Sequence, residues 1–207
     1  MKGPRADRYT MGARSPESTR LQGVFLARHG ETDYNATRRF QGRLPVPLNA
    51  TGREQAAVLA ERAAAYGFVE LWASPLARAL QTAEIVGARL GLEPRLDERL
   101  VETDCGDWTD RPQAEIEAED PVGLAAFARA DADFAFPGGE SFRAQTERVM
   151  AALEDLTLRP HPVLAVSHGM SIRLAFAALG HPLDTVPNAA LLDCSGAASS
   201  SGRAPDF

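Results

Sequence analysis

The stretch FLARHGETDYN, residues 25–35, joins a short apolar run to a group of charged side chains. The apolar run belongs to GVFLARH (23–29), which is unbroken and rich in β-type residues, and this pattern predicts a buried strand. The strand delivers Arg28 and His29 at its end, directly before Gly-Glu-Thr. This ending leaves two alternatives open: a turn after a strand, or a reaction centre.

The elements expected around this strand alternate between strands and helices. We predict helices at 51–67, 75–91 and 169–180, helical stretches at 112–132 and 139–158, and strands at 69–74, 93–100, 162–168 and 188–195. Thr51 followed by Glu54 indicates an N-cap with a capping box, and Gly67 indicates the end of that helix. The alternation predicts an α/β fold, a three-layer α/β/α sandwich with a mostly parallel central sheet.

Composition limits the classes of partner and site. The chain has 207 residues, a 44% hydrophobic share and a net charge of −6, which fit a globular domain and argue against nucleic acid and anionic membranes as bulk partners. The two cysteines form no framework, and no CxxC or HxxxH pair indicates a metal site. We therefore expect a reducing compartment, no metal and no cofactor.

The two ends of the chain differ from its body. Residues 1–20 are polar, arginine-rich and interrupted by prolines, without the apolar segment of a secretory signal, so we expect a flexible leader and a cytoplasmic location. Residues 196–207 are rich in glycine, serine and alanine, which is typical of a disordered tail. The body, 21–195, is predicted to be a single domain.

Polar residues follow the predicted strands where ligands usually bind. In open α/β sheets that place is the crevice beyond the carboxyl ends of the strands. The residues expected there are Arg28, His29, Ser74, Arg78 (one turn into its helix), Glu102, His168 and Gly169.

This set is chemically interpretable as a site for phosphoryl transfer. Arginines offer forked donors to phosphate, and helix N-termini add N–H groups for an anion. A histidine among them can attack phosphorus, and a nearby carboxyl group can protonate the departing oxygen. Taken singly, each residue is more typical of a turn, a helix cap or a surface charge, and we assign His161 and His181 to turns. Because the signals coincide at several strand ends, the catalytic interpretation is favoured.

Several motifs also resemble a known family. The segments LARHGETDYN, QGRLPVPLNATGREQA, ASPLARALQTAEIV, ERLVETDCGDW, PGGES and VSHG, in this order from residue 24 to about 181, resemble the histidine phosphatase (phosphoglycerate mutase-like) superfamily. The resemblance implies that His29 is phosphorylated and that Glu102 is the proton donor. It further implies a phosphate pocket of Arg28, Arg78 and His168.

The same resemblance implies further site residues and shows two departures. It implies that Asn35 contacts the phosphoryl group or substrate, that Gln41 and Gly42 lie in a loop over the site, and that Glu140 has a partly structural role. Together with Gly169 at the start of the helix 169–180, Asn35, Gln41 and Gly42 are predicted to bind phosphate or substrate. Tyr34 stands where the family usually has tryptophan, a change we expect to affect packing only. Asp110 stands where glycine is frequent, so the loop after the acid is expected to differ.

Three functions remain open at this point. The lid segment, defined as residues 103–138, is acidic on balance, with Arg111 and Arg129 as its only cations and Leu124, Phe127, Phe134 and Phe136 as apolar material. This composition favours a phosphatase for small organic phosphomonoesters over a phosphoglycerate mutase, which must clamp a second phosphate. A phosphate-binding module without chemistry is the third alternative, although such a module has no need of Glu102. A homodimer is implied by the family alone.

Overall fold

The structure, a computed structural model, describes residues 21–196, so the predicted leader and nearly all of the predicted tail lie outside the described residues. In chain order the elements are β1 Val24–Arg28, α1 Asp33–Ala36, α2 Ala50–Ala63, η2 Ala64–Tyr66, β2 Glu70–Ala73, α3 Ala77–Leu90, β3 Pro94–Leu96, η3 Glu98–Leu100, η4 Gly106–Trp108, α4 Gln113–Glu119, α5 Pro121–Ala128, α6 Phe142–Leu156, β4 Val163–Ser167, α7 Gly169–Ala178 and β5 Leu191–Asp193. No helix in this part of the chain is long and apolar enough to cross a bilayer.

The central sheet brings the ends of distant strands together. Its five strands are ordered β3-β2-β4-β1-β5, and all neighbours are parallel except β5, which runs antiparallel to β1 at one edge. Arg28 at the end of β1 is in register with Ser167 at the end of β4, and Ala73 at the end of β2 is in register with Val166. The residues that follow these strands therefore start from one edge of the sheet.

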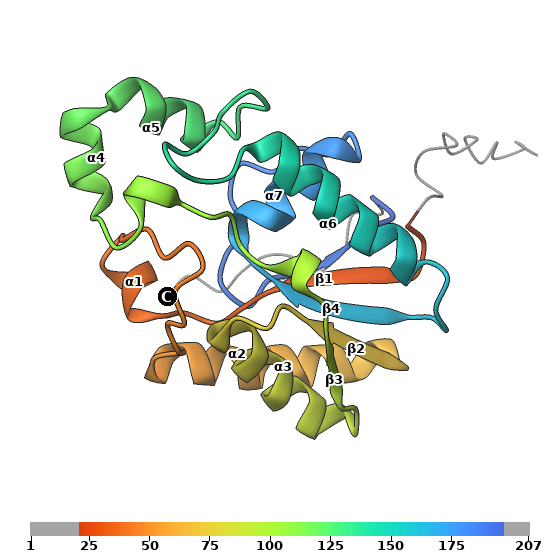
Figure 1. Cartoon of the computed structure of the whole chain (residues 1–207). Coiled ribbons are helices and arrows are strands. Elements are labelled where there is room, and N and C mark those ends of the chain that lie inside the picture. Colours follow the sequence, from red (N-terminus) through yellow and green to blue (C-terminus); the bar gives the residue numbers. More distant parts are fainter. Residues whose placement is uncertain (1–20, 197–207) are drawn as a thin grey trace, which may run out of the picture.

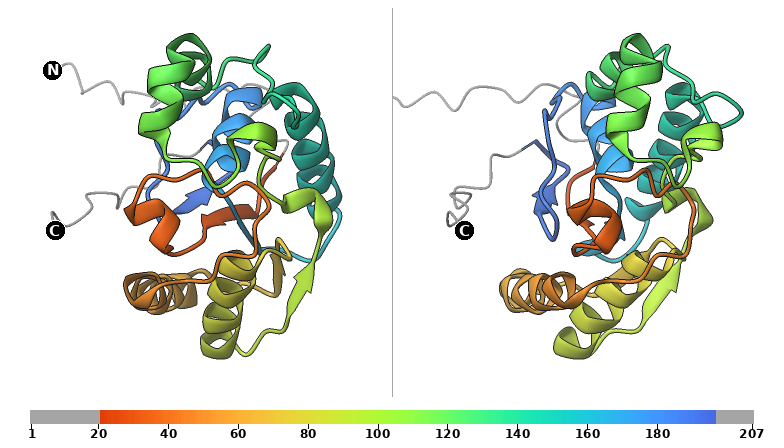
Figure 2. Two further views of the ribbon diagram at one scale, coloured as in Figure 1. Left: turned by 60° about the vertical axis from the view of Figure 1, so that its left-hand side comes forward. Right: turned by 90° about the vertical axis from the view of Figure 1, so that its left-hand side faces the viewer.

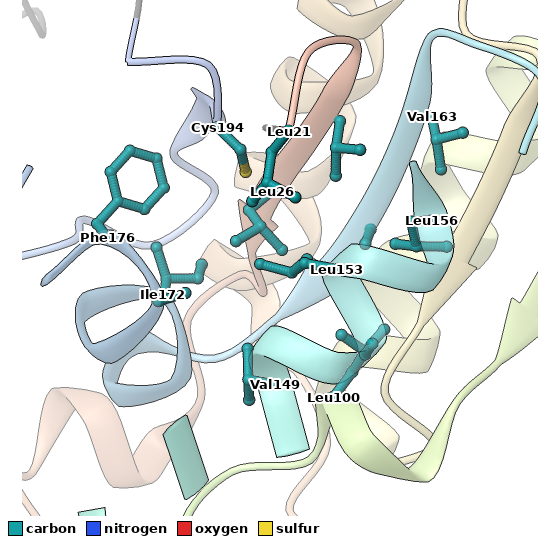
Figure 3. Close-up of a cluster of buried hydrophobic side chains, with 14 of the residues drawn as sticks. Leu21, Leu26, Leu100, Val149, Leu153, Leu156, Val163, Ile172, Phe176 and Cys194 are labelled. Carbon is teal, nitrogen blue, oxygen red and sulfur yellow. The ribbon is translucent and has the colours of Figure 1, made fainter. Parts of the chain in front are cut away.

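Helices cover both faces of the sheet, which confirms the predicted three-layer sandwich (Figures 1 and 2). In β4, Val163 and Ala165 pack with α6 and α7, while Leu164 and Val166 pack with α2 and α3. Figure 3 shows the first of these two layers, with Leu153 of α6 and Ile172 of α7 lying near Leu26 of β1. A strand buried on both faces carries apolar residues throughout, and for this reason the run at 162–168 shows no alternation.

The lid segment forms a separate small core. Its aromatic side chains pack on Phe40 and Phe142 and on α7; the cluster consists of Phe40, Cys105, Trp108, Ile116, Phe134, Phe136, Phe142, Met170 and Leu174, with Leu124 and Phe127 against it. The apolar residues named from the sequence thus hold the lid segment onto the body of the domain.

The structure corrects three local predictions. Asn49, rather than Thr51, caps α2, because its side-chain oxygen accepts the N–H of Gly52 at 2.8 Å. The helical stretch at 112–132 is divided into α4 and α5 at Asp120, which caps α5 ahead of Pro121. The strand at 93–100 is only three residues long and continues as the turn η3, since the chain leaves the sheet edge there.

Two glycines let α2 approach the loop after β1. A Cβ atom on Gly30 would lie 2.2 Å from the carbonyl oxygen of Gly52, and one on Gly52 would lie 2.0 Å from that of Glu31. Real Cβ contacts are never this short, so the two backbones can only pack with glycine at both positions. The N-terminus of α2 thereby supports the loop that carries His29.

Candidate active site

A cavity of about 340 Å³ opens at the carboxyl ends of β1 and β4. Most of the residues predicted for the site line it: Arg28, His29, Asn35, Gln41, Gly42, Arg78, Glu102 and Gly169. His168 lies directly behind, with its ring centroid 5.1 Å from that of His29. The structure thus brings together every site residue that was named from the sequence.

The His29 ring is held in one tautomer. Its Nδ1 lies 2.6 Å from the carbonyl oxygen of Gly30, and because a carbonyl can only accept, Nδ1 carries the proton. Nε2 is then the unprotonated nitrogen, and it accepts a hydrogen bond from Nε of Arg78 at 3.2 Å. Burial, followed by the charges of Arg78 and Arg28, lowers the pKa of His29 well below its usual value. The ring is therefore a neutral base with its lone pair on Nε2.

Arg78 is a buried cation fixed by three acceptors. Besides His29, its guanidinium donates to the carbonyl oxygens of Gly42 at 2.8 Å and Leu44 at 3.1 Å. The side chain is almost fully buried, and this desolvation lowers the pKa of Arg78 to about 10, which still leaves it charged at neutral pH. Arg78 thus ties the loop over the site to the histidine.

Two buried side-chain nitrogens, one in the cavity and one directly behind it, have no partner among the described residues. They are Nε of Arg28 and Nδ1 of His168. The other ends of these side chains are held, Arg28 by the carbonyl oxygen of Val186 at 2.6 Å and His168 Nε2 by the hydroxyl of Ser74 at 2.8 Å. The hydroxyl oxygen of Ser74 accepts the N–H of Leu76 at 3.3 Å, so its hydrogen can be donated to Nε2 of His168, and Nδ1 then carries the proton of the neutral ring. Unsatisfied buried polar groups are rare and costly, and in this tautomer an anion with several oxygens would satisfy both nitrogens. Gly169 packs on Arg28, since a Cβ there would lie 3.2 Å from its Nε.

Glu102 presents its two carboxyl oxygens to different surroundings. Oε1 accepts hydrogen bonds from the Thr103 N–H at 3.0 Å and from Nε2 of Gln145 at 3.1 Å. Oε2 accepts one, from the Met170 N–H at the start of α7, at 3.2 Å. Because Glu102 lines the cavity, Oε2 is the oxygen with spare capacity to exchange a proton there.

Comparison with known proteins agrees with this geometry. Residues 24–198 match the model of the histidine phosphatase superfamily (branch 1). The chain belongs to this superfamily. A probable phosphoglycerate mutase GpmB of Enterobacter sp. (strain 638) is 38% identical over 176 residues, which are 83% of this chain and 81% of that protein.

Solved structures of histidine phosphatase relatives include both reaction types by name. A mycobacterial glucosyl-3-phosphoglycerate phosphatase in complex with VO3 is 36% identical, with a TM-score of 0.74 over 82% of this chain and 90% of its own. A phosphoglycerate mutase from Thermus thermophilus is 33% identical, with a TM-score of 0.68 over 81% and 90% of the two chains. Membership of the superfamily therefore supports an enzyme but leaves open which reaction it catalyses.

The two amides assigned to this histidine phosphatase site leave donors free. The side-chain oxygen of Asn35 accepts the N–H of Thr32 at 3.1 Å, and that of Gln41 accepts the Thr32 hydroxyl at 3.0 Å. Since both oxygens are engaged and both side chains line the cavity, their NH2 groups are the parts available to a ligand. This arrangement agrees with their predicted role in substrate contact.

Tyr34 and Asp110, the two departures from the family pattern, contact each other. The Tyr34 hydroxyl donates to the carboxylate of Asp110 at 2.7 Å, and Arg39 forms an ion pair with the same carboxylate at 3.0 Å. The expectation that Tyr34 matters only for packing is therefore wrong. Asp110 has a φ of 64°, a left-handed conformation that a side chain rarely adopts. Its hydrogen bonds hold the start of the lid segment in that conformation.

Sequence reasoning missed two groups of residues around the cavity. The lining that it did not name comprises Arg39, Phe40, Thr103, Cys105, Gln113, Met170, Arg173, Asp184, Thr185 and Val186, whereas Phe127 and Phe136 had been named as apolar residues of the lid segment. The supports behind Glu102 form the second group: Gln145, Arg148 and Ser171. Gln145 carried a signal, because it interrupts the apolar face of α6 that Phe142, Val149 and Leu153 otherwise form.

Acidification is expected to destabilise the folded protein. The fold keeps both His29 and His168 neutral, since burial and then the charge of Arg78 lower the pKa of each ring well below 6.5. The unfolded chain therefore binds protons that the folded chain does not. The free energy of unfolding is unaffected by these rings above about pH 6.5 and decreases below it, by up to about 1.4 kcal/mol per pH unit for each ring.

Thermal melting between about pH 8 and pH 5 measures this loss. In a His29→Gln variant the decrease in melting temperature should be smaller, because one of the two rings is gone. An equal decrease in the two proteins would contradict the assignment of a depressed pKa to His29.

Proposed function

We propose that this chain is a metal-independent phosphomonoesterase that hydrolyses small organic phosphates through a phosphohistidine at His29. The observation that carries the proposal is the convergence of a neutral Nε2 on His29, an unpartnered Nε on Arg28 and the carboxyl group of Glu102 on one cavity, with the unpartnered Nδ1 of His168 directly behind it. A nucleophile, an anion pocket and an acid are the parts that such a reaction needs.

The first step forms the phosphoenzyme. The Nε2 lone pair of His29 attacks phosphorus as the bond to the ester oxygen breaks, and the protonated carboxyl group of Glu102 gives its proton to that oxygen. Arg28, Arg78 and His168 donate to the non-bridging oxygens, which offsets the charge spread over them in the transition state. The leaving alcohol then departs from the lid side of the cavity.

The second step returns the enzyme to its starting state. The carboxylate of Glu102 takes a proton from a water molecule, whose oxygen attacks the phosphohistidine as the N–P bond breaks. The electron pair of that bond returns to Nε2 of His29, and inorganic phosphate leaves. Nδ1 keeps its proton throughout, because the Gly30 carbonyl holds it.

The pairing of the outer arginines favours hydrolysis over a mutase reaction. Arg111 forms an ion pair with Glu119 at 2.6 Å, Arg129 with Asp131 at 3.8 Å, and Arg39 with Asp110. Since each of these three cations already has a carboxylate, none of them is a ready clamp for the second phosphate of a bisphosphorylated intermediate. Arg173, which also lines the cavity, donates instead to the carbonyl oxygens of Leu183 at 3.2 Å and Ala128 at 2.8 Å. The lid segment instead presents Phe127 and Phe136 to the cavity, which suits the organic part of an ester.

The names of the relatives give some support both to a phosphatase and to a phosphoglycerate mutase. The mycobacterial phosphatase is described with VO3 and, in another structure, with inorganic phosphate, which supports an oxyanion pocket of this type. The probable phosphoglycerate mutases among the relatives support the mutase as second candidate. We propose a cytoplasmic location as well, which cell fractionation would test.

The test measures phosphate release from a panel of sugar, nucleotide and other small phosphomonoesters, in the presence of EDTA. Primed isomerisation of phosphoglycerate is measured beside it. We expect release from several esters, undiminished by EDTA, and no isomerisation. Isomerisation that depends on a bisphosphoglycerate primer, without net hydrolysis, would replace the proposal by the mutase, and loss of release in EDTA would overturn its metal independence.

A further inference from the structure

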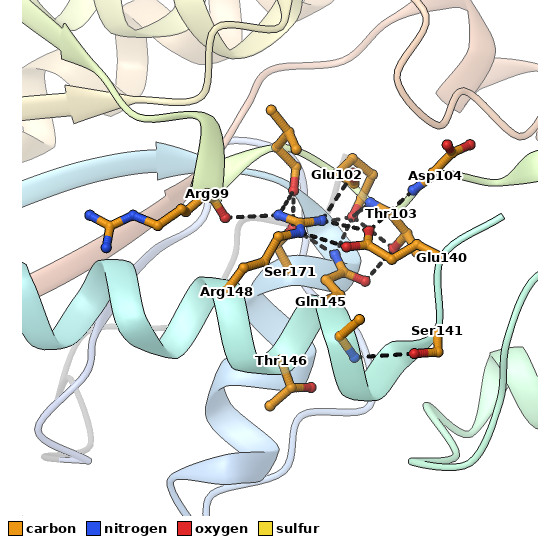
Figure 4. A network of polar contacts seen from close by, with 12 residues as sticks. Arg99, Glu102, Thr103, Asp104, Glu140, Ser141, Gln145, Thr146, Arg148 and Ser171 are labelled. Atoms are coloured by element: carbon orange, nitrogen blue, oxygen red, sulfur yellow. Dashed lines mark hydrogen bonds and ion pairs between the residues drawn. The ribbon is translucent and has the colours of Figure 1, made fainter.

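The segment that carries Glu102 is attached to α6 by two side chains, Arg148 and Gln145. Arg148 donates to the main-chain carbonyl oxygens of Arg99 at 2.8 Å, Val101 at 2.7 Å and Glu102 at 3.2 Å. Glu140 completes this support through a bidentate ion pair with Arg148, at 2.7 and 2.8 Å. Figure 4 shows the whole network. Arg148 thereby fixes the backbone that carries the acid.

Gln145, one turn earlier on α6, contacts the carboxyl group itself. The side chain is completely buried, and one of its N–H groups donates to Oε1 of Glu102 at 3.1 Å while the other donates to the Ser171 hydroxyl at 2.9 Å. Its oxygen accepts the hydroxyl of Thr103. Because all three polar positions of the amide are used, its orientation is fixed with the NH2 group toward the carboxylate.

Ser171 links this amide to the same carboxylate from α7. Its hydroxyl lies 3.1 Å from the carbonyl oxygen of Val101 and 3.3 Å from Oε1 of Glu102. Oε1 of Glu102 thus accepts from Gln145, Ser171 and the N–H of Thr103. Among the described residues, Oε2 accepts from the N–H of Met170 alone. Such an asymmetric arrangement selects which oxygen carries the catalytic proton.

We propose that Gln145, supported by Ser171, is a positioning residue for general acid catalysis: it holds Oε1 of Glu102 away from the reaction so that Oε2 delivers the proton to the leaving oxygen. This inference rests on the proposed function and adds a role to a side chain that does not touch the substrate. A glutamine buried at an apolar position of α6 costs stability unless it is hydrogen-bonded, and the hydrogen bonds that Gln145 makes go to Glu102, Ser171 and Thr103.

The test compares two esters in single-turnover formation of the phosphoenzyme. An alkyl phosphate needs a proton on its poor leaving group, whereas p-nitrophenyl phosphate hardly does, so only the first depends on the acid. Gln145→Leu keeps the volume and removes the donors. We expect it to slow phosphorylation by the alkyl ester about tenfold or more, as for loss of a hydrogen bond to a group that becomes charged in the transition state, and to leave the aryl ester within about twofold.

A pH profile gives a second readout. With fewer donors on the carboxylate, the alkaline limb of the alkyl-ester rate, along which the acid loses its proton, should move to higher pH in Gln145→Leu. Ser171→Ala should also slow phosphorylation by the alkyl ester and move the alkaline limb to higher pH, both by less than Gln145→Leu. It replaces Gln145→Leu as the test variant if that protein does not fold. Thr146→Val, at the next residue on α6, is the matched control and should behave as wild type, because among the described residues the Thr146 hydroxyl bonds to the Phe142 carbonyl alone.

If Gln145→Leu slows phosphoenzyme formation equally with both esters and the alkaline limb does not move, the positioning role of Gln145 is overturned, while the proposed phosphatase function stands. An unchanged rate with both esters would do the same. A wild-type protein that forms no phosphoenzyme from either ester would instead overturn the proposed function, and this inference with it.

Discussion

Replacement of His29 by alanine is expected to reduce phosphoester turnover by about 10⁴-fold or more and to abolish the phosphoenzyme, because the variant loses the nucleophile itself. The fold should persist, since the strand β1 and the glycine contacts beneath the loop remain. Steady-state phosphate release measures the loss of turnover, and a melting curve at about pH 7.5 tests whether the fold persists.

His161→Ala is the matched control for His29→Ala. His161 lies in an exposed turn, where Nε2 bonds to the carbonyl oxygen of Thr157, and it does not line the cavity. Turnover in this control should equal that of wild type. Undiminished turnover in His29→Ala would show that the reaction, if any, does not use this histidine.

The second large effect is expected at Arg78. Its guanidinium contacts His29 and two loop carbonyls at once, and it would also face the non-bridging oxygens of the substrate. Arg78→Ala should lower kcat/KM by about 10³-fold, the size of effect found when a preorganised donor to a developing charge is lost. Inhibition by inorganic phosphate should weaken in parallel, because the ground state loses the same cation.

Arg78→Lys separates charge from geometry. Lysine keeps a positive charge but lacks the planar fork that reaches three acceptors, so we expect it to recover only a small part of the activity. Arg89→Met is the control on the same helix, because Arg89 is exposed and, within residues 21–196, pairs with Glu61 alone. Wild-type kinetics in Arg78→Lys would contradict the argument from geometry, since a point charge alone would then suffice.

The residues at strand ends could be predicted from the sequence because topology alone places them. Strands β1 and β4 are short apolar runs with an immediate polar ending, and parallel pairing in register brings Arg28 and His168 to one edge whatever the details of packing. Glu102 reached the same cavity even though β3 ends at Leu96, since the chain continues along this edge through the turn η3.

Other features depended on contacts that no local pattern contains. The cap of α2 was misassigned because Thr51 and Asn49 are both good caps, and the choice follows from the contact of Gly52 with the loop after β1. The hydrogen bond between Tyr34 and Asp110 joins residues that lie far apart in the chain. Gln145 was overlooked because an amphipathic helix was expected to place only apolar residues on its buried face.

The most direct test of the account is to identify the phosphorylated atom. The protein is mixed with a phosphomonoester substrate, quenched in alkali, where phosphohistidine survives, and analysed by peptide mass spectrometry and phosphorus NMR. The account predicts one phosphoryl group on His29, attached to Nε2, because Nδ1 is blocked by the Gly30 carbonyl. Phosphate on Nδ1, on another residue, or on no residue while turnover proceeds would contradict it.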